Sequence, residues 1–344
     1  MQVPRHLSRK GWLAAGAFLL ALLLATACGS GDDGEVTSVT FMAGFKPQAN
    51  LPFVAAYVAQ SNGYFEEQGL DVKILHASSG QHLKLLLAGD VDITTADASS
   101  VLKRRADPGI PIRAIALFGQ RGQQAFVALE SSGIASPKDW EGKRFGYKVS
   151  PPPEYLALLQ EAGVDRSKIK EVRVGFDPRV LTQGQVDILA VFKSNEPDTL
   201  KRLGFPVRVF DPADAGVPTL GLTYITTTDV LEQDPDLIQR FLKATMKGLE
   251  FAMGNEEETL DIVLQFAPKE NREHQRFMLR QELRDAQGPV TEANGLGWMT
   301  EAQWRALHRS LVEHEALAKP VDPASAFTDR FLREIYEDGK LLWP

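Results

Sequence analysis

The sequence predicts an α/β fold built from two lobes, and three observations support this prediction. Strand-like apolar segments alternate with helix-like segments over most of the chain. This alternation is typical of mostly parallel sheets flanked by helices. It occurs in two successive series, and 344 residues are long for one domain but ample for two. We therefore expect one sheet in each lobe.

The first series covers the chain up to about residue 120. Short runs rich in valine, isoleucine and phenylalanine predict strands, and the segments between them have helical spacing of apolar residues. The expected strands are 39–45, 71–76, 91–97 and 112–118, and the expected helices are 52–62 and 80–88.

The second series repeats this organisation. Its expected strands are 126–129, 144–147, 169–174 and 186–192. One helix is expected to begin near Pro137, and a second is expected at 153–162. The chain is expected to cross between the lobes near 119–124 and near 221–225.

From residue 234 onward the sequence is helical. Asp234 is a plausible N-cap because Pro235 follows it at the first helical position. One face of this helix is then apolar, with Leu237, Phe241, Ala244, Gly248 and Ala252. Further helices follow, with loops at 288–289 and 319–320. We assign residues 37–120 and 224–344 to the first lobe and 121–223 to the second.

The N-terminus has the pattern of a signal peptide. Basic residues precede an apolar run at 11–24, and small residues lead to Cys28. A transmembrane anchor is the alternative, but the run is shorter than the ~20 apolar residues of a spanning helix. Cys28 is the only cysteine, so an intramolecular disulfide is excluded.

Cys28 follows Leu-Ala-Thr-Ala, which resembles a bacterial lipobox. This resemblance implies removal of residues 1–27 and lipidation of Cys28. Residues 28–36 then form a polar, flexible tether. The protein is expected to be attached by lipid to the cell membrane, on its extracytoplasmic face.

The charge of the chain disfavours binding to nucleic acid. The full chain carries a net charge of −7. Removing residues 1–27 takes away three basic residues and no acidic one, which leaves 35 basic against 45 acidic residues and a net charge of −10. Neutralising phosphates requires a basic face, and the sequence shows no basic stripe.

Polar and aromatic residues follow the strands of both series. In open α/β sheets, ligands bind at the carboxyl ends of the strands, where loops and helix N-termini converge. We therefore expect a ligand cleft between the lobes. Its candidate residues are Phe45, Lys46, Gln48, Asn50, Phe53, Ser79, Gly80, Asp97, Gln120, Gln123, Gln124, Tyr147, Phe192, Ser194, Asn195 and Glu196.

Three segments carry a family resemblance. FVAAYVAQSNGYFEEQGLDVKI, LLLAGDVDITTADASS and DLIQRFLKATMKGLEFA resemble the substrate-binding proteins related to thiamine-pyrimidine synthase, over most of residues 37–265. That branch belongs to the type II, two-lobed periplasmic binding proteins that serve ABC importers. Within it, AGFKPQANLPF, GQRGQQAF, GYKVSPPPE, FDPRVLTQGQVDI and FKSNEP look most like riboflavin-binding lipoproteins of vitamin uptake systems.

The resemblance implies a type II periplasmic-binding-protein fold that binds riboflavin and delivers it to a membrane permease. The alternative ligand is a pyrimidine precursor of thiamine. A flavin is large, flat and mostly apolar, so its site requires aromatic faces and a few placed polar groups. No cofactor beyond the transported ligand is expected, and we expect a monomer.

Several candidates have a purely structural explanation as well. Phe53 and Tyr57 lie four residues apart on a helix, which also fits a packing stripe. Glu196 could be a carboxylate at a helix start, and Asp97 could cap the helix that follows it. Lys148 could simply be solvated.

An enzyme is the competing class, because the resembling synthases share this architecture. The resemblance implies an iron site with cysteine and histidine, but the one cysteine here lies in the lipobox. The histidines lack metal-ligand spacing, and the sequence contains neither a phosphate-binding GxxxxGK[ST] loop nor a GxSxG elbow. We therefore expect neither a metal site nor catalysis. A lipid-anchored sensor or adhesion module would not explain so many polar loops at strand ends.

Overall fold

A computed structural model describes residues 36–78, 80–148 and 150–344 of the chain. The expected signal peptide, the lipidation site at Cys28 and most of the tether lie outside the described residues, and so does Ser79. Among the residues that are described, no helix is both long enough and apolar enough to cross a membrane.

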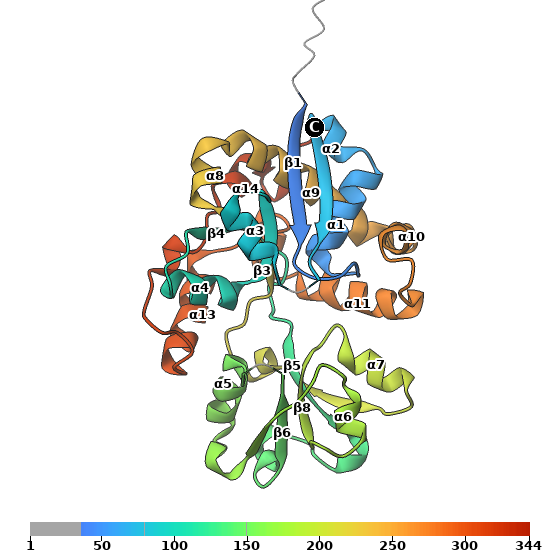
Figure 1. Ribbon diagram of the computed structural model, residues 1–344, viewed down its shortest axis with the longest axis vertical. Coiled ribbons are helices and arrows are strands. Elements are labelled where there is room, and N and C mark those ends of the chain that lie inside the picture. The colour runs from blue at the N-terminus through green and yellow to red at the C-terminus, as the bar shows by residue number, and fades with distance from the viewer. Residues whose placement is uncertain (1–35, 79, 149) are drawn as a thin grey trace, which may run out of the picture. The chain divides into compact units, whose positions relative to one another are not determined.

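The first sheet is in the upper half of Figure 1 and has the strand order β2-β1-β3-β10-β4. β1 pairs in parallel with β2 and β3, whereas β10 lies antiparallel between β3 and β4. The strands are β1 (Thr37–Ala43), β2 (Leu70–His76), β3 (Ile93–Asp97), β4 (Ile112–Leu117) and β10 (Leu222–Thr227).

The second sheet is in the lower half of Figure 1 and has the order β7-β6-β8-β5-β9. β6 is parallel to β7 and β8, and β5 is antiparallel to β8 and β9. The strands are β5 (Gln124–Leu129), β6 (Arg144–Tyr147), β7 (Lys170–Arg173), β8 (Ile188–Phe192) and β9 (Val207–Phe210).

Helices cover both sheets. Those of the first sheet are α1 (Leu51–Ser61), α2 (Tyr64–Glu67), α3 (His82–Ala88), α4 (Ala98–Ala106), α8 (Thr228–Gln233), α9 (Pro235–Gly254), α10 (Glu256–Phe266), α11 (Arg272–Asp285), α12 (Pro289–Asn294), α13 (Glu301–Glu313) and α14 (Arg330–Ile335), with a small hairpin of β11 (Tyr336–Glu337) and β12 (Lys340–Leu341). Those of the second sheet are α5 (Pro153–Ala162), α6 (Arg179–Thr182) and α7 (Glu196–Arg202). We call the first sheet and its helices the first lobe, and the second sheet and its helices the second lobe.

The predicted α/β class is confirmed, but both sheets are mixed rather than mostly parallel. In the first sheet the antiparallel strand is β10. The chain returns from the second lobe at this strand, which lies between β3 and β4 from earlier in the sequence. Neither β9 nor β10 was predicted from the sequence. The helix expected near Pro137 is also wrong, because that segment forms only a short 3₁₀ turn at Pro137–Trp140.

The predicted start of the long helix α9 is confirmed. The Asp234 side chain accepts a hydrogen bond of 3.1 Å from the backbone N–H of Leu237, as an N-cap does. The predicted apolar face is buried: Phe241 packs against rings of β1, α2 and β10, and Gly248 faces α1. At the closest approach, a Cβ added to Gly248 would lie 2.3 Å from the carbonyl oxygen of Ala55. Only glycine allows the two helix backbones to come this close.

We expect Gly248→Ala to lower the free energy of unfolding by about 1–3 kcal/mol, because the added methyl group overpacks the α1–α9 contact. The intrinsic helix propensity of alanine works in the opposite direction, by about 1 kcal/mol. Urea denaturation measures the net effect. Gly254→Ala, in the last turn of the same helix and with no atom within 4 Å of the added Cβ, is the control and should cost nothing. Equal losses in both variants would contradict the close-packing explanation.

The two crossings between the lobes lie side by side. The backbone N–H of Gly221 donates to the carbonyl oxygen of Gly119 at 2.8 Å. A Cβ on either glycine would lie 2.9 Å from the Cα of the other. The two crossings therefore pack backbone against backbone, as one narrow ribbon.

Candidate functional site

A cavity of about 650 Å³ lies between the lobes. The first lobe contributes the loop after β1, the end of β3 and parts of α1, α3 and α4. The second lobe contributes the end of β8 and the loop that follows it. The volume falls within the ~300–1,000 Å³ typical of small-molecule sites. The lining residues include Thr95, Ser100, Arg104, Lys148, Phe176 and Met278 beside the predicted ones.

Most of the predicted ligand residues come together in this cavity. Phe45, Lys46, Gln48, Asn50, Phe53, Asp97, Gln123, Phe192, Ser194, Asn195 and Glu196 all line it. Whether they bind a ligand stays a prediction. Their convergence follows the strand-end rule, because the loops after β1, β3 and β8 face the same space.

A second, smaller cavity of about 250 Å³ adjoins the first, and we call it the side compartment. It is lined by residues of both lobes, including Lys103 and Glu154. It shares Asp97, Gln123, Lys148, Phe176 and Phe192 with the main cavity. Gln124 lines the side compartment but not the main cavity, and its amide donates to the carbonyl oxygen of Val191 at 3.0 Å.

Three predicted residues line neither cavity. Gly80 is absent from both linings. The amide of Gln120 donates to the carbonyl oxygen of Trp298 at 2.8 Å and accepts from Gln303 at 2.7 Å, so it connects the crossing to the C-terminal helices. Tyr147 packs instead with the core of the second lobe. It lies two residues after buried Phe145 in β6, and alternate residues of a strand share one face.

The loop after β1 is held by α11. Gln275 accepts a hydrogen bond of 2.7 Å from the N–H of Ala49, and Glu282 accepts one of 2.6 Å from the N–H of Leu51. Gln48 donates to the side chain of Asn50, which in turn donates to Glu282 at 2.6 Å. The loop is therefore a wall fixed by buried polar contacts.

Glu282 is the centre of this network. Beside the two contacts from the loop, it accepts hydrogen bonds from Gln123 at 2.7 Å and from Ser194 at 3.2 Å. Ser194 belongs to the second lobe, so the carboxylate connects the two lobes. Burial raises the pKa of Glu282 to about 7, against the hydrogen bonds that favour its charged form.

Lys193 makes a second buried connection. Its ammonium lies 2.8 Å from Asp211 in the second lobe and 3.1 Å from Asp285 at the end of α11. Burial raises the pKa of Asp285, and the charge of Lys193 opposes that rise. The positive charge of Lys193 thus compensates the negative charges of one aspartate in each lobe.

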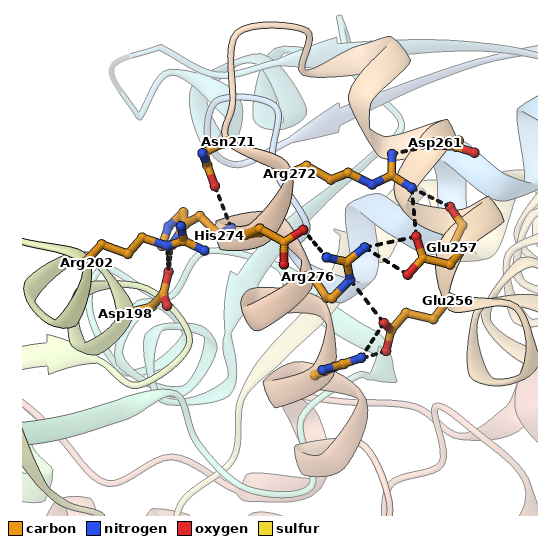
Figure 2. Close-up of polar contacts among 11 residues, drawn as sticks. Asp198, Arg202, Glu256, Glu257, Asp261, Asn271, Arg272, His274 and Arg276 are labelled. Carbon is orange, nitrogen blue, oxygen red and sulfur yellow. Dashed lines mark hydrogen bonds and ion pairs between the residues drawn. The ribbon is translucent and has the colours of Figure 1, made fainter.

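Figure 2 shows α11 between α7 of the second lobe and α10 of the first. On one side, His274 Nδ1 lies 2.7 Å from an Asp198 carboxylate oxygen. On the other side, Arg272 and Arg276 pair with acidic residues of α10, such as Glu257 at 3.0 and 2.8 Å. α11 therefore serves as a common support for the loops of both lobes.

The second lobe presents two exposed aromatic rings to the cavity. Phe176 is 74% exposed and Phe192 is 42% exposed. The Lys148 ammonium lies 5.7 and 5.5 Å from the centres of these rings and pairs with Glu196. The other oxygen of Glu196 accepts from the N–H of Phe192 at 2.9 Å. Glu196 is the first residue of α7, as the structural alternative expected, and its role in ligand binding stays a prediction.

Phe176 was not predicted as a site residue, although it follows an expected strand and the strand-end rule could have found it. Glu282 and Gln275 were not predicted either. These two lie within a helix far along the chain, and no sequence signal connects them with the loop after β1.

Two α/β lobes joined by two adjacent crossings, with a cavity lined by both, form the fold of type II periplasmic binding proteins. The periplasmic aliphatic sulphonate binding protein SsuA from Escherichia coli has this fold, with a TM-score of 0.66 at 16% identity over 84% of this chain and 91% of that one. The chain belongs to the NMT1/THI5-like family, which matches residues 50–259.

Two relatives resemble the chain over most of its length. The riboflavin-binding protein RibY from Chloroflexus aurantiacus is 27% identical over 82% of this chain and 83% of that protein. The formylaminopyrimidine-binding protein from Halalkalibacterium halodurans is 26% identical over 91% of this chain and 97% of that protein.

Proposed function

We propose that this protein is the extracytoplasmic solute-binding component of an ABC-type vitamin importer and that its ligand is riboflavin. The protein would capture the vitamin in the cavity between its lobes and deliver it to a membrane permease. The relative that binds riboflavin supports the ligand, and the periplasmic-binding-protein fold supports the role.

The observation that carries this proposal is the exposure of aromatic rings in the cavity. Large apolar side chains are normally buried, and a group of exposed ones marks a binding site. The described residues include four markedly exposed phenylalanines, and Phe45, Phe176 and Phe192 among them line the cavity. Phe45 comes from the first lobe and the other two from the second. Rings on both sides suit a flat heteroaromatic ligand.

The polar groups of the cavity support a ligand without net charge. Both lysines of the main cavity are neutralised, Lys46 by Glu270 at 2.6 Å and Lys148 by Glu196. Asp97 and Arg104 add one charge of each sign to the lining. Most of the other polar groups are amides and hydroxyls, such as those of Gln48, Asn50 and Ser194. Such groups can pair with the imide edge of a flavin, which carries both acceptors and a donor.

We propose that the mature chain begins at a lipidated Cys28 and is held at the outer face of the cell membrane as a monomer. This rests on the lipobox-like sequence before Cys28. Mass spectrometry of protein purified from native membranes tests it, since an unmodified Cys28 in the membrane fraction would refute the anchor.

We propose no catalytic role. Within residues 36–78, 80–148 and 150–344, no group of three or more histidine, cysteine, aspartate or glutamate residues is placed to hold a metal ion.

Titration of riboflavin with the purified protein should quench flavin fluorescence in a saturable manner. Phe176→Ala should then weaken binding about tenfold, because a stacked ring contributes about 0.5–1.5 kcal/mol beyond its buried area. The melting temperature of the empty protein should not change, since Phe176 is 74% exposed.

Phe205→Ala is the matched control for this experiment. Phe205 is also exposed, at 41%, but it lines neither cavity. Equal effects of the two variants would show that Phe176 does not contact the ligand. Binding of formylaminopyrimidine without any binding of riboflavin would refute the ligand while leaving the receptor role intact.

A further inference from the structure

The side compartment is too small for a complete ligand of ordinary size. Its volume of about 250 Å³ is below the ~300–1,000 Å³ of typical ligand sites. It adjoins the main cavity, with which it shares Asp97, Gln123 and three further lining residues. A ligand whose ring lies in the main cavity could therefore extend one branch into the compartment.

Asp97 lies where the two cavities meet. It is the last residue of β3 and the N-cap of α4, but its side chain accepts no capping hydrogen bond. An N-cap aspartate ordinarily uses its carboxylate for that purpose. Asp97 instead lines both cavities, half-buried, and burial raises its pKa to about 6. Capping of α4 therefore does not explain why a carboxylate occupies this position.

Glu154 lines the side compartment from the opposite lobe, in the first turn of α5. Both carboxylates therefore line the same compartment. Burial raises the pKa of Glu154, and the negative charge of Asp97 raises it further. The Lys103 ammonium, which also lines the compartment, lowers the pKa of both. Among the described residues, neither carboxylate forms a hydrogen bond or ion pair with another residue.

The two carboxylates and Lys103 determine which chemical group of a ligand can bind in the side compartment. An ionised carboxylate only accepts hydrogen bonds, and a buried one is costly unless donors reach it. Hydroxyl groups supply such donors, and their oxygens can accept from Lys103. A phosphate would bring negative charge to two unpaired carboxylates and few donors to satisfy them.

We propose that the side compartment binds a polyhydroxylated chain of the ligand through Asp97 and Glu154, and that the same two carboxylates discriminate against a ligand whose chain ends in phosphate. The inference rests on the proposed function, because riboflavin consists of a flat ring and a polyol chain.

Three flavins test this selection on the unaltered protein. Riboflavin carries the polyol, lumiflavin has a methyl group in its place, and flavin mononucleotide has the polyol ending in phosphate. Riboflavin should bind at least tenfold more tightly than either of the other two. Calorimetry or fluorescence titration at constant pH and salt measures all three affinities.

Variants then connect the selection with the two carboxylates. Asp97→Asn and Glu154→Gln, singly and together, should lower the affinity for riboflavin about tenfold more than they lower the affinity for lumiflavin. The double variant should also bring the affinity for flavin mononucleotide closer to that for riboflavin. Glu161→Gln, an exposed position of the same helix α5, should leave every affinity at its original value.

The results separate the two hypotheses. If riboflavin and lumiflavin bind equally well, or if flavin mononucleotide binds as tightly as riboflavin, the polyol does not occupy the side compartment and this inference is wrong, while the proposed function stands. If none of the three flavins binds, the proposed ligand is wrong, and the inference fails with it.

Discussion

Glu282→Ala is expected to lower the free energy of unfolding by about 3–5 kcal/mol. The change leaves buried donors on Asn50, Gln123 and Ser194 and at the N–H of Leu51 without their acceptor. Each buried donor left unpaired costs about 1–3 kcal/mol, and the losses are not additive because water can enter the space. Urea denaturation of the variant and the unaltered protein measures the difference.

Two variants sharpen the interpretation. Glu282→Gln keeps the shape of the side chain but replaces one acceptor with a donor, so its loss should be intermediate. Glu273→Ala removes an exposed carboxylate of the same helix that pairs with Arg276, and such exposed pairs contribute about 0–1 kcal/mol. If Glu282→Ala cost no more than Glu273→Ala, the network would not hold the loop after β1.

The second large effect is expected for Lys193→Ala. Removing one partner of a buried ion pair typically costs about 3–5 kcal/mol, because the remaining charge is uncompensated. Asp211 would keep Arg121 at 2.9 Å, so the deficit should come mainly from Asp285. Asp285→Asn in the same chain should therefore recover part of the loss, and a double-mutant cycle measures the coupling.

The pH dependence of this loss has a defined sign. The folded-state pKa of Asp285 is already raised above its ordinary value of 3.8, and removing Lys193 raises it further. The destabilisation is then fully present above the folded pKa and absent below about pH 4, where Asp285 is protonated in both states. The stability difference between the variant and the unaltered protein should narrow as the pH falls.

Lys168→Ala is the control for Lys193. Lys168 is 57% exposed and pairs with Glu141 at 2.9 Å on the surface of the second lobe. Its loss should cost at most about 1 kcal/mol at any pH. A Lys193→Ala variant as stable as Lys168→Ala would show that the buried triad contributes nothing.

Local sequence patterns predicted most elements but not how the sheets are completed. The N-cap at Asp234 and the apolar face of α9 are properties of neighbouring residues, and both are confirmed. β10 was missed because residues 221–225 were expected to form a crossing between the lobes, although Leu222–Thr227 is rich in β-branched and aromatic residues. Its place between β3 and β4 depends on partners far away in the sequence, such as Asp97 for Leu222, and no local pattern records such a partner.

In the candidate site, too, local patterns predicted some residues, and others depend on long-range packing. Asp97 and Phe192 end strands and Phe45 lies just after one, so a rule about strand ends placed them at one cavity. Tyr147 also ends a strand, but its register relative to Phe145 directs it to the core. Glu282 could not have been found, since its role arises only when α11 packs beneath loops from both lobes.

The position of β10 inside the first sheet determines the order in which the chain can complete its fold. A growing chain contains all of β5–β9 before it contains β10. The second sheet is thus continuous in sequence and can close early, whereas β3 and β4 must wait for a partner more than 100 residues later. Until then the first sheet lacks the strand between β3 and β4, and it lacks α9. If the chain is released to fold before β10 is synthesised, β3 and β4 are therefore exposed without a partner strand. Binding to a chaperone until synthesis is complete would protect them.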